Sequence, residues 1–192
     1  MKAKFIYESL FIKKQGKDIL HDFEYEYFGS DTLLTSSIKN NFEEGILSAI
    51  KDGAVISKDD IVNAIDNNNI NTVKILLNNI DIKEDVSILR FASDKGRYKI
   101  VKLLLDNGAI ITPECLIWSS YEGYYKVVKL LLDAGANVHT HSDTSLRSAS
   151  KYGHYEVVKL LLDAGADVHA YNGEAITVAA NNKIKNLLIQ YE

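Results

Sequence analysis

The sequence predicts an all-α protein, a solenoid of stacked helix-turn-helix pairs. A pattern recurs every 27–30 residues, each copy has the apolar spacing of an amphipathic helix, and a glycine ends the helix at the same place in successive copies. The chain has 192 residues, of which 46% are hydrophobic and 25% are charged. These values are ordinary for a folded domain, and no apolar run is long enough to cross a membrane.

The repeats emerge when the sequence is compared with itself. The longest matching stretches are 96–109, 123–136 and 153–166, with shorter matches at 46–54 and 73–79. The glycines that open the three long stretches are 27 and 30 residues apart. Within the last stretch, Val157, Leu160 and Leu161 have the i, i+3, i+4 spacing of a buried helix face. A single helix pair buries too little apolar surface to be stable, so we expect each pair to depend on its neighbours.

Each repeat is predicted to contain two helices. The first begins with capping residues, a capping box at Ser57–Asp60 and a Thr112-Pro113 pair that caps and starts a helix. The second is predicted to end at a glycine in the left-handed conformation, Gly135 or Gly165. The turns between the two helices fall at Gly96, Gly123 and Gly153.

These signals divide the chain into about five repeats and two ends. The predicted repeats are 31–57, 58–84, 85–111, 112–141 and 142–171. Residues 172–192 are predicted to be a truncated C-terminal capping repeat, because Lys183 and Lys185 make its second helix more polar. Residues 1–30 are predicted to be an N-terminal cap or a degenerate repeat, with a separate recognition element as the alternative.

The repeats resemble ankyrin repeats. Residues 153–168, Gly-His-Tyr-Glu-Val-Val-Lys-Leu-Leu-Leu-Asp-Ala-Gly-Ala-Asp-Val, match the family's second-helix signature. Residues 144–149 are similar to its Thr-Pro-Leu-His-x-Ala opening, with Ser145 replacing the proline and Arg147 the histidine. The family period is about 33 residues, so the shorter period implies shortened β-turn fingers. The short period and the Asn-, Ile-, Lys- and Tyr-rich composition also resemble ankyrin arrays of giant DNA viruses of amoebae.

The resemblance implies a non-catalytic protein-protein interaction module, an adaptor or competitor that binds a partner on the concave face made by the first helices. A viral origin would make that partner a host protein and the location the host cytoplasm. The net charge of −4 argues against a nucleic-acid partner, because phosphate binding needs an excess of Lys and Arg. We expect a cytoplasmic monomer without membrane association or cofactor. The alternative is a structural protein that self-assembles through under-capped ends.

The candidate partner-binding residues lie toward the ends of the first helices, before the turn glycine, except for Arg147, which occupies the register of the family's histidine. They are Tyr121, Tyr152, Arg147, Lys151, Glu122, Lys95 and Asp94. Tyrosine supplies rigid amphipathic contact area and arginine is enriched at binding hot spots, so a Tyr/Arg cluster favours protein binding. Ordinary surface is the alternative interpretation of the same residues.

The sequence gives weaker evidence for a catalytic or metal site. No phosphate loop, zinc-protease or nucleophile-elbow motif occurs, so we expect no enzyme activity and no catalytic residues. His139, His141 and His169 could hold a metal on adjacent connectors, but surface histidines are the favoured interpretation. Cys115, near a helix start, is predicted to be buried and inert.

Residues that recur at one register are predicted to share an environment. Lys74, Lys102, Lys129 and Lys159 are predicted to form a solvated face, with an acidic partner surface as the alternative. Tyr98, Tyr125 and Tyr155 are predicted to be partly buried packing residues. Phe91 and Trp118 share a first-helix register, where we expect burial between repeats.

Overall fold

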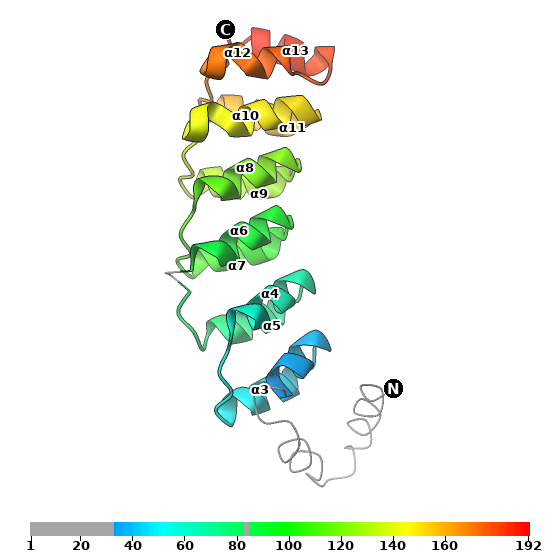
Figure 1. Ribbon diagram of the computed structural model, residues 1–192, viewed down its shortest axis with the longest axis vertical. Helices are drawn as coiled ribbons and strands as arrows, with labels where there is room; N and C mark the ends of the chain where they lie inside the picture. The colour runs from blue at the N-terminus through cyan, green and yellow to red at the C-terminus, as the bar shows by residue number, and fades with distance from the viewer. Residues whose placement is uncertain (1–32, 83–84) are drawn as a thin grey trace. The chain divides into compact units, whose positions relative to one another are not determined.

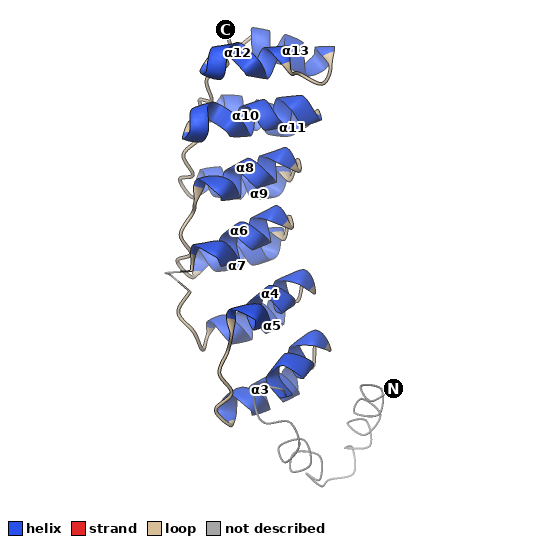
Figure 2. Ribbon diagram, in the orientation of Figure 1, coloured by secondary structure: helices blue, strands red, loops and turns tan. Residues whose placement is uncertain are grey.

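The computed structural model describes residues 33–82 and 85–192, and all the regular secondary structure in these ranges is helical (Figure 2). The predicted all-α fold is thereby confirmed, and none of the described helices could span a membrane. The chain divides into two units, Met1–Leu76 and Leu77–Glu192. The predicted N-terminal cap, residues 1–30, lies outside the described residues.

The N-terminal unit contains a helical segment at 33–39 and then three helices. These are α3 (Glu43–Lys51), α4 (Lys58–Asp66) and α5 (Ile70–Leu77), the last of which reaches the boundary between the units. The predicted capping box is confirmed, since Ser57 and Asp60 exchange their side-chain to backbone hydrogen bonds. Asp60 also accepts a hydrogen bond from the Thr35 hydroxyl (2.9 Å), so the start of α4 is tied to the preceding repeat.

The C-terminal unit consists of four helix pairs (Figure 1). They are α6 (Val86–Asp94) with α7 (Tyr98–Asp106), α8 (Pro113–Tyr121) with α9 (Tyr125–Asp133), α10 (Thr140–Tyr152) with α11 (Tyr155–Asp163), and α12 (Ala170–Thr177) with α13 (Asn182–Ile189). The first helices α6, α8, α10 and α12 pack side by side in chain order, and the second helices α7, α9, α11 and α13 do the same. The unit therefore has a first-helix layer and a second-helix layer.

The core of this unit repeats with the sequence. Each of the second helices α7, α9 and α11 buries two consecutive apolar residues and the residue one turn later, a stripe that faces the first helices and the neighbouring repeats. The members of this stripe are Ile100, Val101 and Leu104 on α7, Val127, Val128 and Leu131 on α9, and Val157, Val158 and Leu161 on α11. All are at most 1% exposed, which corresponds to about 1.5–3 kcal/mol of hydrophobic stabilisation for each of the larger side chains.

The glycines at the helix ends and turns have the left-handed conformation that the sequence predicts. Gly135 and Gly165 have φ of +91° and +92° and end the second helices in the left-handed conformation. The turn glycine Gly123, with φ +77°, also lies directly beneath the His154 ring of the next repeat. His154 Nε2 donates a hydrogen bond to the Tyr121 carbonyl (2.8 Å), so this turn is a contact between successive repeats.

The connectors are short and contain no strand within the described residues. Before the regular part of α10, three successive residues, 141–143, have φ of +51° to +54°, and 171–173 repeat this left-handed turn in α12. Asp143 in the first turn is buried and accepts a hydrogen bond from the Asp167 backbone N–H of the next connector (3.1 Å). The shortened fingers at 141–143 and 171–173 are therefore left-handed turns, and the first of them is tied to the next connector through Asp143.

One predicted cap is wrong in its detail. Thr112 occupies the N-cap position of α8, but its side chain makes no capping hydrogen bond to the helix backbone. The hydroxyl instead lies 3.7 Å from Cys115 Sγ. Pro113 in the first turn has no N–H to offer, which reduces the number of donors that need a cap.

Candidate functional site

Three aromatic side chains from neighbouring first helices form one group, hereafter the aromatic cluster: Trp118 and Tyr121 on α8, and Tyr152 at the end of α10. The ring centroids of Tyr121 and Tyr152 are 4.2 Å apart, with an interplanar angle of 56°. The Trp118 ring meets Tyr121 edge-to-face at 5.6 Å. Such contacts hold the rings in one arrangement, because edge-to-face and tilted pairs are the favoured geometries of aromatic side chains. The structure thus brings together two of the predicted binding residues, Tyr121 and Tyr152.

The cluster is open to solvent. Trp118 is 42% exposed and Tyr152 is 45% exposed. The predicted burial of Trp118 is therefore wrong. Trp118 follows the buried Leu116 by two residues, about 200° around the helix, so it points away from the core. The sequence signal that could have found this is the buried pattern of α8 itself, Cys115, Leu116, Ser119 and Ser120, which leaves position 118 outside.

Two of the predicted charged residues, Lys151 and Glu122, adjoin tyrosines of the aromatic cluster in the sequence, whereas Asp94 and Lys95 lie at the end of α6. Lys151 Nζ lies 5.6 Å from the Tyr152 ring centroid, and Glu122 follows Tyr121 as an exposed residue. On the neighbouring α6, Lys95 Nζ lies 5.4 Å from the ring centroid of the half-buried Phe91. An exposed aromatic centre with a charged border is the arrangement found in protein interfaces.

Arg147 has a different environment from the two tyrosines with which it was grouped. Its Nε donates to the Glu174 carboxylate on α12, and its Nη1 donates to the Ser142 carbonyl in the left-handed turn (3.2 Å). The guanidinium also stacks over the Tyr171 ring, 4.3 Å from the centroid. Arg147 therefore joins α10 to α12, and its replacement is expected to weaken this contact between repeats as well as any binding.

The contact between Tyr121 and Tyr152 has a measurable electrostatic signature. A hydrogen bond with the Tyr152 side chain, together with the charges of that phenol and of Glu122, raises the pKa of Tyr121 above the ordinary value for tyrosine. A raised folded-state pKa means that the neutral form is favoured in the folded state. This contribution to stability is present below the unfolded pKa of about 10 and is lost as the pH rises through the higher folded-state value.

We predict that Tyr152→Phe returns the pKa of Tyr121 toward its ordinary range, because the phenylalanine ring keeps the stacking contact but has no hydroxyl. The measurement is a pH titration of the tyrosine side-chain carbon signals by NMR. Tyr191 serves as the control, since a hydrogen bond to Asp163 raises its pKa and Tyr152→Phe leaves that contact intact. An unchanged Tyr121 titration would contradict the contact.

The histidines and the cysteine are separate from the aromatic cluster. His139 Nδ1 lies 3.1 Å from Asp143 Oδ1, which places it at the left-handed turn. Within residues 33–82 and 85–192, no group of three or more His, Cys, Asp or Glu side chains is arranged to hold a metal, so His139, His141 and His169 are not brought together. Cys115 is free and fully buried in α8, as predicted.

The tyrosines at the start of the second helices are more exposed than predicted. Tyr98 and Tyr125 are 37% and 42% exposed, whereas Tyr155 is half-buried. Tyr98 and Tyr125 each precede the first buried residue of their helix by two positions, about 200° of helix rotation. Lysines of the following repeat lie over two of these rings, Lys126 over Tyr98 and Lys183 over Tyr155.

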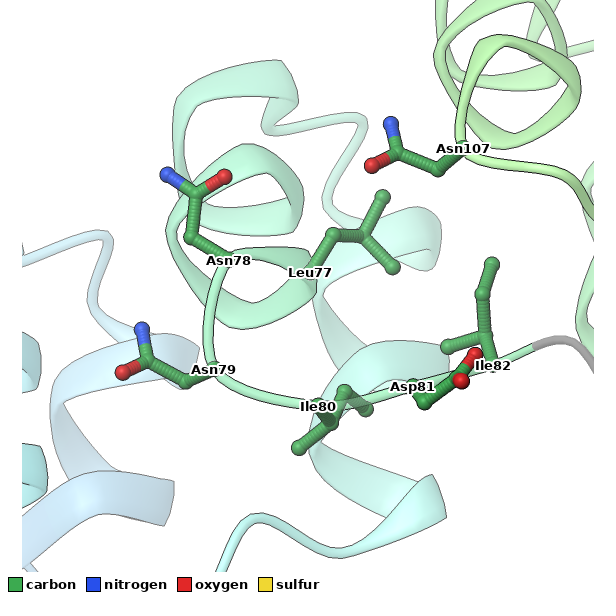
Figure 3. A pocket seen from close by; sticks show the side chains of 7 residues that line it. All are labelled: Leu77, Asn78, Asn79, Ile80, Asp81, Ile82 and Asn107. Atoms are coloured by element: carbon green, nitrogen blue, oxygen red, sulfur yellow. The ribbon is translucent and has the colours of Figure 1, made fainter.

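A pocket of about 340 Å³ lies where α5 ends and next to the end of α7 (Figure 3). It is lined by Leu77, Asn78, Asn79, Ile80, Asp81, Ile82 and Asn107, all within the Leu77–Glu192 unit. Figure 3 shows Leu77 and Asn107 approaching it from different segments, with amide and apolar side chains around it. The lining has no nucleophile with an adjacent base, and none of the predicted binding residues contributes to it.

Comparison with known proteins identifies the fold. Residues 112–172 match a family model described as "Ankyrin repeats (3 copies)". The structure resembles the human ASB11 ankyrin repeat domain at 22% identity, covering 83% of this chain and 82% of that chain with a TM-score of 0.71. It also resembles the ankyrin repeat domain of Bcl-3, a member of the IkappaB protein family, at 22% identity, with 81% of each chain covered and a TM-score of 0.69. No curated protein matches the sequence. Residues 112–172 therefore match ankyrin repeats, and the chain has the fold of an ankyrin repeat domain.

Proposed function

We propose that this chain is a protein-binding module, and that its partner docks on the first-helix layer at the aromatic cluster. The observation that carries the proposal is the exposure of Trp118 and Tyr152, at 42% and 45%, around the packed Tyr121 ring. A soluble protein gains nothing in stability by leaving such rings in water, whereas a partner that covers them gains their full apolar area.

The composition of the cluster supports tight local contact. Trp and Tyr are the residue types most often found at binding hot spots, where they fill pockets on the partner and are shielded from water by surrounding residues. Because the rings already contact one another, little side-chain entropy is lost when a partner covers them. The adjacent charges of Lys151 and Glu122 then set the orientation and the rate of association rather than the affinity. We expect an ordinary interface of about 800 Å² on each side.

A non-catalytic adaptor or competitor fits these features. The cluster offers binding groups and no pairing of nucleophile and base, so its chemistry is recognition. An adaptor would hold its partner for a second protein, and a competitor would block the partner's own interface. The resemblance to viral arrays extends the proposal to a host protein of the cytoplasm as the partner.

The test is a triple variant, Trp118→Ala, Tyr121→Ala and Tyr152→Ala. Loss of hot-spot residues is expected to weaken binding by about 100-fold or more, measured by titration against a partner recovered by affinity purification from the producing cells. The three rings lie outside the buried stripe but contact one another, so the free energy of unfolding should fall by about 1–3 kcal/mol.

A control variant removes apolar side chains elsewhere that are at least as exposed. Leu47, Val55 and Ile189 are 53%, 73% and 47% exposed, and their replacement by alanine should leave the affinity unchanged. Equal affinity of the aromatic variant and the wild type would exclude the cluster as the docking site. Equal losses in both variants would indicate a general effect of surface apolarity.

Self-assembly is a second candidate, favoured by the last helix pair and the residues that follow it. Tyr171, Ile189 and Tyr191 there are 62%, 47% and 42% exposed, so the C-terminal end of the array offers apolar surface to another copy. Light scattering at tens of micromolar separates the candidates. A particle of 21.5 kDa would reject self-assembly, and a mass that grows with concentration would support it.

A further inference from the structure

The repeats allow an internal comparison on the second-helix layer. Each of α7, α9 and α11 begins with a tyrosine, and the second residue of the following second helix lies next to it in register. The three pairs are Tyr98 with Lys126, Tyr125 with Glu156, and Tyr155 with Lys183, separated by 28, 31 and 28 residues. Two of the three pairs therefore place a lysine beside the ring, and the middle pair places a carboxylate there.

Both lysines place their ammonium group over the tyrosine ring of the preceding repeat. Lys126 Nζ lies 5.9 Å from the Tyr98 ring centroid, and Lys183 Nζ lies 3.7 Å from that of Tyr155. Both distances fall within the range of a cation–π contact. Among the described residues no cation is placed over Tyr125, because the corresponding residue is Glu156, and Tyr125 is 42% exposed.

A pocket takes the place of the missing lysine. It has a volume of about 310 Å³ and is lined by Tyr125, Glu156, Lys159, Leu160 and Asp163. Tyr125 comes from α9 and the other residues come from α11, so the pocket lies between neighbouring second helices of one unit. Its walls are one aromatic face, one leucine and three charged side chains.

The charge of the lining favours a cation. Two carboxylates, Glu156 and Asp163, face one ammonium group, Lys159. Asp163 accepts a hydrogen bond from the Tyr191 hydroxyl at 2.5 Å, which leaves the second carboxylate oxygen available. Within the described part of the chain Glu156 has neither a hydrogen-bond nor an ion-pair partner for its side chain, and it is exposed.

We propose that this pocket binds an arginine or lysine side chain of a basic protein segment, with the cation over the Tyr125 ring and beside the Glu156 carboxylate. The guest would occupy the place that Lys126 and Lys183 occupy in the neighbouring repeats. The site lies on the second-helix layer and is independent of the aromatic cluster on the first-helix layer. The pocket and the proposed docking face can therefore be tested independently.

The test uses a short synthetic peptide, acetyl-Gly-Arg-Gly-Arg-Gly-amide, titrated into the isotope-labelled full chain and followed by NMR. We expect saturable shifts of the backbone signals of Tyr125, Glu156 and Asp163. The same peptide with citrulline in place of arginine keeps the shape and loses the charge, so it should bind about tenfold more weakly.

The decisive variant is Glu156→Lys, which supplies the lysine found in the neighbouring repeats. The variant should fold, since the array already accommodates Lys126 and Lys183 at this register, and it should lose the peptide-induced shifts. Tyr125→Ala should lose them as well. Tyr98→Ala is the matched control, because that ring already has its own lysine, and Glu44→Lys controls for net charge; both should bind as the wild type does.

The outcomes separate the possibilities. Loss of binding in Glu156→Lys and Tyr125→Ala with retention in both controls supports the pocket. Absence of saturable shifts, equal binding of the citrulline peptide, or full binding by Glu156→Lys overturns it. The triple variant of the aromatic cluster should still bind the peptide, which distinguishes failure of this site from failure of the docking face.

Discussion

Replacement of Leu131 by alanine is expected to lower the free energy of unfolding of the Leu77–Glu192 unit by about 2–5 kcal/mol. Leu131 lies in the middle of the repeats on α9 and its side chain is 0% exposed. The substitution removes its contacts and leaves a cavity, which close-packed neighbours fill only in part. Because α9 packs against both α7 and α11, the loss also weakens the coupling between repeats.

Chemical denaturation followed by circular dichroism measures this change. Lys129→Ala on the same helix is the control, since Lys129 is exposed and forms a surface ion pair with Asp133 (3.2 Å), and it should change the free energy of unfolding by about 0.5 kcal/mol or less. A loss below about 1 kcal/mol for Leu131→Ala would show that the repeats do not share the close-packed core described above.

Replacement of Gly123 by alanine is expected to cost about 2–3 kcal/mol. A Cβ atom there would lie 2.4 Å from His154 Nδ1, and the residue has φ +77°. The left-handed conformation costs a non-glycine residue about 1–2 kcal/mol. Displacing His154 would also break its 2.8 Å hydrogen bond to the Tyr121 carbonyl, worth about 0.5–1.5 kcal/mol.

Gly135→Ala separates these two contributions. Gly135 has φ +91°, and an added Cβ would meet nothing within 4 Å, so only the conformational cost of about 1–2 kcal/mol applies. In a His154→Ala background the steric part of the cost should disappear. The free-energy cost of Gly123→Ala, measured in this double-mutant cycle, should then equal that of Gly135→Ala. If Gly123→Ala and Gly135→Ala cost the same without that change, the His154 ring does not constrain the turn.

The helices and their core were predictable because their signals are local and repeated. The spacing of Val157, Leu160 and Leu161 defines a helix face, and glycines such as Gly135 end each helix in a conformation that other residues adopt at a cost. Repetition strengthened each inference, since an apolar stripe that recurs at one register is buried in the same way in α7, α9 and α11. The position of Tyr121 and Tyr152 at the ends of first helices followed from the same register.

The remaining features depend on contacts between repeats, which a helical period does not specify. Register alone placed Trp118 and Tyr98 among packing residues, but their direction relative to the buried stripe leaves both exposed. Arg147 occupies the register of the family's histidine, yet its partners are Glu174 and a carbonyl of the left-handed turn. That turn has three successive residues with positive φ, His141, Ser142 and Asp143. Their side chains gave no signal from which this conformation could be predicted.

Site-specific photo-crosslinking tests the proposed docking face most directly. A benzoylphenylalanine residue is introduced either at Tyr152, in the aromatic cluster, or at Ile189 on α13, two positions with similar exposure of 45% and 47%. If a protein partner covers the cluster, irradiation of the complex crosslinks the partner at position 152 and leaves it free at position 189. Crosslinking at 189 with none at 152, while the complex remains intact, would contradict the account.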